Sequence, residues 1–302
     1  MKKISSLRNR LINSAAVLVV AAVILAAGGA AQAASFTGAY SQNFDSMGTS
    51  TTLPTEWTVW NITGAHSDWE TSIPANAISG GTQMTTGSAM LDTSIGNGTK
   101  SASLYYNIAD SNSTSNRVLS TSPTGNAGIA IQLVLTNNTG ATINSLNLSY
   151  DIVKFYDGQL QSSTTSGLPL GEELPGYQLF YSVNGGAYVN VSALNPVTVA
   201  DGIHPVIPIG TPGAYTSGTT TGPVDYSVTS ITNAPVSLAT AWATGQNLTL
   251  RWVDDNAVNI SPDQVIGLDN VNISTVPIPA AIWLLGSGLV GLVGVRRRMR
   301  KS

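Results

Sequence analysis

The chain has 302 residues, with 13 Lys and Arg against 16 Asp and Glu, two His and no Cys. Nine of the basic residues lie within the first ten or the last seven positions, so residues 34–279 hold four basic and 16 acidic residues, a net charge of −12. This acidic middle argues against nucleic-acid binding, and the lack of Cys excludes a disulfide scaffold, a thiolate zinc site and a Cys nucleophile.

Residues 1–33 have the three-part pattern of a secretory signal peptide. Four basic residues lie within the first ten positions, and an uncharged apolar stretch follows from Ala15 to Ala27. Ala31 and Ala33 then supply the small residues that signal peptidase requires, which predicts cleavage before Ala34. The alternative is a signal helix that stays in the membrane as a permanent anchor.

Residues 34–275 show the period-two alternation of β-strands and no sustained helical period. Apolar residues alternate from Ile129 to Leu135 and from Leu146 to Ile152, which predicts a hairpin around Asn138-Thr139-Gly140. The stretches 177–183 and 188–191 predict a second hairpin, and 265–273 a last strand. We therefore expect one all-β domain, a two-sheet, jelly-roll-like β-sandwich.

Two stretches interrupt the strands of this domain. Residues 159–173 are rich in Ser, Thr, Gly and Leu, and residues 195–223 hold five prolines and a run of Thr, Ser and Gly. Loops of this length are either functional or mobile. The composition favours a mobile insertion.

Residues 276–302 combine a short motif, an apolar stretch and a basic cluster. The motif is Val276-Pro277-Ile278-Pro279-Ala280-Ala281, and residues 278–295 are 18 uncharged positions before the basic cluster 296–301. An 18-residue helix is about 27 Å long, enough for a thin bilayer, and the arginines would keep its end in the cytoplasm. An ordinary tail anchor would have the same order of parts.

This tail resembles the PEP-CTERM sorting signal of Gram-negative bacteria, in its V-P-x-P-A-A-x-W-L variety. The resemblance implies recognition and removal by exosortase, a membrane-embedded enzyme similar to cysteine transpeptidases, and a link to extracellular polysaccharide and biofilm. Ile278 stands where the family's Pro-Glu-Pro motif has Glu, so the exosortase subtype is open. The implied route is export, transient membrane anchoring, and release to the cell surface or the extracellular matrix.

The segment order of residues 34–275 resembles an exported bacterial jelly-roll domain that often precedes such tails. Asn43-Phe44-Asp45 at its start and Leu268-Asp269-Asn270-Val271 at its end are also similar to animal MAM adhesion modules. In those modules the first and last strands meet, and acidic residues there hold a cation. The resemblance implies a fold more than an activity.

An acidic exported sandwich without Cys suits Ca²⁺, which takes oxygen ligands. If the terminal strands pair, Asp45 and Asp269, with Asp68 as a third ligand, are the candidates for one structural Ca²⁺ ion. The same carboxylates could instead accept hydrogen bonds from backbone N–H groups. The segment Asp254-Asp255-Asn256 is a second place for a site, although it lacks the alternating ligands and Gly of an EF-hand.

Aromatic side chains on a sandwich surface can stack on sugar rings. Trp57, Trp60 and Trp69 are the candidate ligand-binding residues, whereas Trp252 follows the core alternation. Each ring on its own is more often buried than ligand-binding.

The sequence has few of the features expected of an enzyme. Only His66 and His204 are present, with no Ser elbow of the G-x-S-x-G type and no H-E-x-x-H motif. The acidic pairs Glu172-Glu173 and Asp254-Asp255 are adjacent, so on a strand their side chains would point apart. We expect a non-catalytic surface or matrix protein, with a carbohydrate-binding, calcium-dependent adhesion module as the alternative and a secreted hydrolase third.

Overall fold

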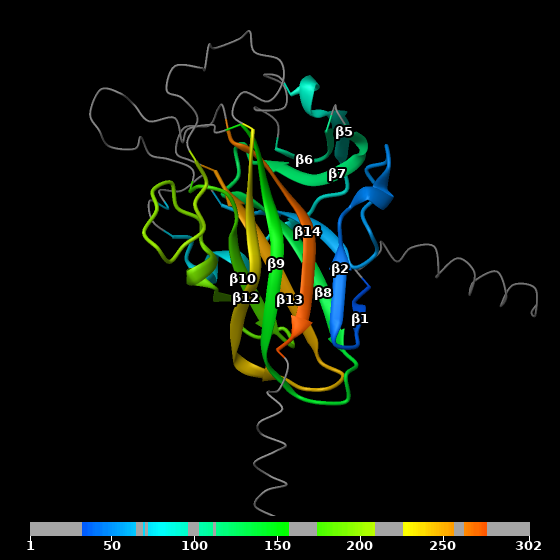
Figure 1. Cartoon of the computed structure of the whole chain (residues 1–302), viewed down its shortest axis with the longest axis vertical. Helices are drawn as coiled ribbons and strands as arrows, with labels where there is room; N and C mark the ends of the chain where they lie inside the picture. The colour runs from blue at the N-terminus through cyan, green and yellow to red at the C-terminus, as the bar shows by residue number, and fades with distance from the viewer. Residues whose placement is uncertain are drawn as a thin grey trace, which may run out of the picture.

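The computed structural model describes residues 32–64, 69, 72–95, 103–110, 113–156, 174–208, 226–256 and 263–276. These residues form an all-β fold of two seven-stranded sheets that pack face to face as a sandwich (Figure 1). The helices among them are short 3₁₀ turns: Asp45–Met47, Ala75–Ser79, Asp92–Ser94 and Ser192–Leu194. None of the helices in the described ranges is long and apolar enough to cross a bilayer.

Sheet A has the strand order β11-β10-β13-β8-β3-β4, with β1 paired in parallel to the end of β8. Its strands are β1 (Ala34–Phe36), β3 (Trp57–Ile62), β4 (Thr82–Gln83), β8 (Gly128–Asn137), β10 (Gln178–Val183), β11 (Val189–Asn190) and β13 (Asn247–Asp255).

Sheet B has the order β12-β9-β14-β7-β6-β5, with β2 paired antiparallel to the second half of β14. Its strands are β2 (Ala39–Gln42), β5 (Gly87–Leu91), β6 (Leu104–Asp110), β7 (Ser113–Ser122), β9 (Ile143–Tyr156), β12 (Ser227–Trp242) and β14 (Val265–Thr275). The first and last parts of the domain therefore lie side by side, since β2 pairs with β14 (Figure 1).

The main core lies between the sheets and is built from the alternating residues of their strands. Trp57 of β3 stacks on Trp252 of β13 with ring centroids 5.7 Å apart, and Tyr150 of β9 meets Trp252 edge-on at 5.7 Å. Such aromatic contacts contribute about 0.5–1.5 kcal/mol each beyond the burial of their area. A smaller apolar cluster covers the outer face of sheet A, and another covers part of sheet B.

The predicted hairpin around Asn138-Thr139-Gly140 is wrong. β8 pairs with β3 and β13 in sheet A, whereas β9 pairs with β12 and β14 in sheet B, so the turn carries the chain from one sheet to the other. The alternation was compatible with both arrangements because each strand turns its apolar face to the same core. Asn137 holds the crossing: its amide Nδ2 donates to the carbonyls of Ala141 and Trp242, both at 2.8 Å.

The second predicted hairpin is confirmed. Phe180 pairs with Asn190 and Tyr181 with Val189, and the turn places Asn184 and Gly185 at φ 51° and 73°. The last strand is also confirmed as β14. Of the two long loops, residues 157–173 and 209–225 lie outside the described residues, while 195–208 contains a short bridge between Val197 and Val206.

The first and last strands mark the ends of the described sandwich. β1 begins at Ala34, β14 ends at Thr275, and Val276 after it is 37% exposed. The expected signal helix, Ala31, and the tail from Pro277 onward, including its apolar stretch and basic cluster, lie outside the described residues.

Candidate functional site

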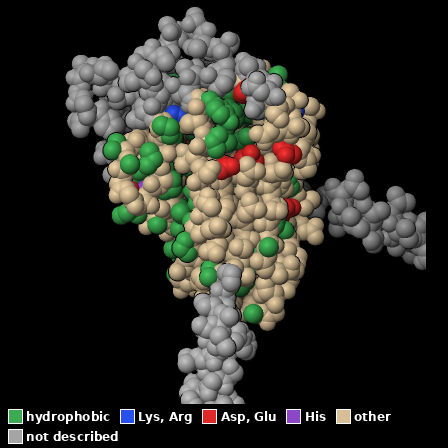
Figure 2. Space-filling view, in the orientation of Figure 1, with side chains coloured by type: hydrophobic (Ala, Val, Ile, Leu, Met, Phe, Trp, Pro, Cys, Tyr) green, Lys and Arg blue, Asp and Glu red, His purple; other side chains and the backbone are tan. Residues whose placement is uncertain are grey.

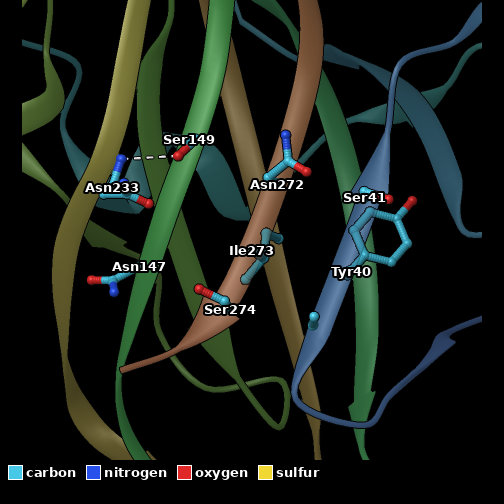
Figure 3. Close-up of a pocket in the computed structure, with 9 residues that line it drawn as sticks. Tyr40, Ser41, Asn147, Ser149, Asn233, Asn272, Ile273 and Ser274 are labelled. Atoms are coloured by element: carbon cyan, nitrogen blue, oxygen red, sulfur yellow. Dashed lines mark hydrogen bonds between the residues drawn. The ribbon is translucent and has the colours of Figure 1, made fainter. Parts of the chain in front are cut away.

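A polar pocket lies on the outer face of sheet B, across β12, β9, β14 and β2 (Figure 3). Its volume is about 340 Å³. The lining is uncharged and mixes polar with apolar groups: Ala39, Tyr40, Ser41, Asn147, Ser149, Asn233, Asn272, Ile273 and Ser274. Amide and hydroxyl groups on neighbouring strands can both donate and accept hydrogen bonds to a ligand rich in hydroxyl groups.

Two β-bulges shape this pocket, and both face the same part of β9. The β12–β9 register shifts between Ile231 and Ala234, and the β14–β9 register shifts between Asp269 and Asn272. Each bulge contains an Asn in the left-handed region, Asn233 at φ 48° and Asn270 at φ 50°. Asn tolerates this conformation, and bulges redirect side chains at functional sites. The backbone N–H of Asn233 donates to the Ser149 hydroxyl at 2.9 Å (Figure 3).

Tyr40 also borders the pocket, but its ring packs against the main core beside Trp57, and its hydroxyl is held by two hydrogen bonds. The hydroxyl donates to Glu56 Oε1 at 2.7 Å and accepts from the Trp57 indole N–H at 2.6 Å. Burial, followed by the hydrogen bond to Glu56, raises the pKa of the Tyr40 phenol far above its usual value. The ring is therefore neutral and fixed in place.

A row of three acidic residues adjoins the pocket. Asp151 of β9 and Asp269 of β14 are directly opposite in register, and Asp45 is close enough for its charge to act on Asp269. Figure 2 shows acidic side chains gathered on this face of the molecule, above a broad uncharged polar surface. Like charges opposite each other destabilise a sheet. Burial raises the pKa of Asp269 to about 7, and the charges of Asp45 and Asp151 add to the rise.

The oxygens of the predicted calcium ligands accept hydrogen bonds. Asp45 Oδ1 accepts from the backbone N–H of Arg117 at 2.9 Å, and its Oδ2 accepts from Asn43 Nδ2 at 2.7 Å. Asp269 Oδ1 accepts from the backbone N–H of Asn270 at 2.7 Å, while Asp68 lies outside the described residues. In the described ranges, no three Asp, Glu, His or Cys side chains are arranged to hold a metal ion. Calcium at Asp45 and Asp269 stays a prediction.

The three candidate tryptophans do not share one surface. Trp57 is 2% exposed and lies in the core, whereas Trp60 is half-buried on the outer face of sheet A. Trp57 and Trp60 are three positions apart, and side chains an odd number of positions apart on a strand point to opposite faces. Trp69 is half-buried against the same outer cluster as Trp60.

Arg251 explains the position of Trp60, and no sequence pattern predicted this contact. Its guanidinium lies 5.1 Å from the Trp60 ring centroid and 5.0 Å from that of Tyr188. Arg251 Nε donates to Gln132 Oε1 at 2.8 Å and Nη1 donates to the carbonyl of Ile78. Arg251 is only 4% exposed, and burial lowers its pKa. One face of the Trp60 ring is thus occupied by a structural cation.

The candidate catalytic groups are scattered. His204 bonds through Nδ1 to Asp201, three residues away on the same surface segment, and His66, Glu172 and Glu173 lie outside the described residues. The neighbours Asp254 and Asp255 have separate partners: Asp254 Oδ2 accepts from Thr121, and Asp255 Oδ1 accepts from the backbone N–H of Leu174.

Comparison with known proteins adds little. No protein family and no curated protein matches the chain. Among solved structures, a cyclase from Fischerella sp. TAU is 12% identical with a TM-score of 0.30, covering 79% of this chain and 98% of that one. A Stig cyclase, Fisc, from the same organism has 13% identity and a TM-score of 0.27, with coverage of 57% and 68%. The catalytic domain of an alpha-1,3-glucanase has 12% identity and a TM-score of 0.21, with coverage of 54% and 23%. Similarity this low carries no argument about function.

Proposed function

We propose that this chain is an exported, exosortase-processed structural protein of the cell surface or extracellular matrix, without a catalytic role. The observation that carries the proposal is the tail sequence of residues 276–301, with its motif, apolar stretch and basic cluster in order. The sandwich supports it, because the last strand ends at Thr275 and leaves Val276 exposed just where the motif begins. We extend this to a jelly-roll-like fold with a signal helix before it and a transmembrane helix at 278–295.

β14, the strand that leads into the tail, suits a protein anchored through its C-terminus. β14 pairs along its length with β9 on one side, and with β7 and then β2 on the other. The backbone N–H of Thr275 still bonds to the carbonyl of Gly38 at 3.0 Å. A chain held or pulled at residue 276 would therefore load a strand with hydrogen bonds on both edges.

The test is the mass and the terminal sequences of the protein recovered from its native envelope and medium. We expect a chain that starts at Ala34 and ends between Pro277 and Ala281. Replacing Pro277 and Pro279 with Ala should leave the tail attached, whereas the control Pro205→Ala with Pro208→Ala should not. Wild-type protein that still carries residues 283–302 would refute processing by exosortase.

The pocket of Figure 3 favours a second function, binding of an extracellular polysaccharide. Its amide and hydroxyl groups match the donors and acceptors of sugar hydroxyls. The acidic row beside the pocket is where a calcium-dependent version of this binding would place its ion. In that case the protein is an adhesion module with a specific ligand.

Calorimetry with polysaccharide purified from the host envelope, with and without chelator, tests this second function. We expect Asn147→Ala combined with Asn272→Ala to weaken binding by about tenfold or more, since each lost hydrogen bond to a hydroxyl contributes about 0.5–1.5 kcal/mol. Asn247→Ala, an exposed Asn on sheet A, is the control. Equal affinity of the double variant and the wild type would contradict a role for this pocket.

A further inference from the structure

Buried polar oxygens without partners gather where β13 ends and β14 begins. Asp254, Asp255, Asn256 and Asp263 are each between 0% and 1% exposed. Within the part of the chain that the structure describes, one oxygen of each has no hydrogen-bond partner: Asp254 Oδ1, Asp255 Oδ2, Asn256 Oδ1 and Asp263 Oδ1. Buried polar atoms are nearly always paired, so four in one stretch require a physical explanation.

The loop between β7 and β8 brings three of these side chains together. Thr121 at the end of β7 donates its hydroxyl to Asp254 Oδ2 at 2.6 Å, and Thr124 donates to Asp263 Oδ2. The carbonyl of Asn126 accepts from Asn256 Nδ2 at 2.8 Å. Each side chain thus bonds to residues 121–126 through one atom, and one oxygen of each has no partner among the described residues.

The side chain of Asp255 lies on the other face of β13. Its Oδ1 accepts from the backbone N–H of Leu174 at 2.8 Å, whereas Asp254 faces Thr121 and the Tyr177 hydroxyl that bonds to Thr121. The group to be explained is therefore Asp254, Asn256 and Asp263.

Removing carboxylates from water costs several kcal/mol per ion unless a cation or strong hydrogen bonds compensate for the loss. Burial raises the pKa of Asp263 to about 8 and that of Asp254 well above its usual range, and the negative charges of Asp255 and Asp263 raise that of Asp254 further. Only hydroxyl and amide hydrogen bonds act in the opposite direction on Asp254. A second carboxylate nearby destabilises the ionised form of each acid further, whereas a bound cation would stabilise the ionised form.

We propose that Asp254, Asn256 and Asp263 bind a Ca²⁺ ion at this end of the sandwich. Two carboxylate oxygens and an amide oxygen are hard ligands of the kind that Ca²⁺ takes, with backbone carbonyls and water completing six to eight positions. With two charged ligands rather than three, we expect the weak affinity of extracellular calcium modules, about 10⁻⁴–10⁻³ M.

The bound ion would connect the two sheets. Asp254 lies on β13 of sheet A and is bound by Thr121 of β7, whereas Asp263 lies just before β14 of sheet B and is bound by Thr124 of the loop that joins β7 to β8. This site is separate from the acidic row of Asp45, Asp151 and Asp269 and does not depend on the proposed attachment or polysaccharide binding.

The test uses the purified full chain, freed of metal with chelator and titrated with CaCl₂ up to about 10 mM, a range set by the expected affinity. Equilibrium dialysis counts the bound ions, and thermal unfolding reports the stabilisation that binding to the folded state must produce. MgCl₂ is the control ion, because Mg²⁺ needs a tighter octahedral arrangement and gives up water reluctantly.

Two variants change the site in opposite directions. Asp263→Asn should weaken Ca²⁺ binding by about tenfold or more, and Asn256→Asp should tighten it severalfold by adding a third charge. Asp201→Asn, an exposed acid on another segment, and Asp45→Asn with Asp269→Asn should leave this ion in place. Near-ultraviolet circular dichroism in chelator checks that each variant is folded.

Wild-type protein that binds no Ca²⁺ up to that concentration would overturn the proposal. So would an Asn256→Asp variant that is less stable and gains no Ca²⁺ affinity, because that result means that the acids are neutralised by protons. Loss of the ion in Asp45→Asn with Asp269→Asn, but not in Asp263→Asn, would place calcium in the acidic row instead.

Discussion

Replacing Arg251 with Met is expected to lower the free energy of unfolding by about 2–4 kcal/mol, because the guanidinium holds together the outer layer of sheet A. Two desolvated cation–π contacts, to Trp60 and Tyr188, contribute about 1–2 kcal/mol each. The change also leaves Gln132 Oε1 and the Ile78 carbonyl without their donor, at about 1–3 kcal/mol each. The Met variant no longer bears the cost of burying a cation, which offsets several kcal/mol of this loss.

Urea unfolding of single and double variants measures the effect. A double-mutant cycle of Arg251→Met with Trp60→Leu should give a coupling of about 1 kcal/mol or more, as expected for a buried cation–π pair. Arg117→Met is the matched control, since Arg117 is 6% exposed and its Nε has no hydrogen-bond partner in the described ranges. A coupling near zero would refute the stacked arrangement and return Trp60 to the residues free to bind a sugar.

Three further changes test other parts of the structure. In chelator, Asp269→Asn should remove a pH dependence of the free energy of unfolding. The pKa of Asp269 is about 7 in the folded state against 3.8 for the free group, so the folded state binds the proton more tightly. Wild-type stability should therefore fall between about pH 4 and pH 7, by at most about 1.4 kcal/mol per pH unit. Parallel urea-stability profiles of the two proteins would contradict it. Trp57→Ala should cost about 3–5 kcal/mol in the same assay, and a cost below about 1 kcal/mol would show that this ring is not in the core. Gly267→Ala should cost about 1–3 kcal/mol, because its Cβ would lie 2.2 Å from Val118 Cγ1; Gly186→Ala, facing only the Val183 carbonyl at 3.1 Å, is the milder control, and equal costs would argue against this packing.

The sequence predicted strands better than it predicted their partners. Alternation found the strands from Ile129 to Leu135 and from Leu146 to Ile152, because every second residue of each is a large apolar side chain that faces the main core. It could not assign them to sheets, since residues facing a common core have the same pattern in a hairpin and in a crossing between sheets. The turn around Asn184 and Gly185 was predictable because it is local and its residues favour positive φ.

Site residues were harder to predict than strands. The sequence was enough to predict that Trp57 and Trp60 lie on opposite faces of the strand, because they are an odd number of positions apart. The burial of Asp254 and Asp263 was not, since acidic residues near turns are normally solvated. Thr121 of β7 and Thr124 of the loop after it, more than 120 residues earlier in the chain, bind these two side chains, and no local pattern records that contact.

β14 links the proposed calcium site to the rest of the molecule, and hydrogen exchange can show this link. Its first residues, Ile266 to Leu268, pair with β7, whose Thr121 binds Asp254, whereas Val271 to Ser274 pair with β2. Removing Ca²⁺ should leave the buried Asp254 and Asp263 without the cation that compensates for their loss of hydration, which weakens this end locally rather than the whole strand. We expect amides at 266–268 to exchange faster in chelator while those at 271–274 keep their rate. Equal acceleration at both ends would mean that any ion present stabilises the fold as a whole, and no change at either end would mean that the buried carboxylates are neutral without it.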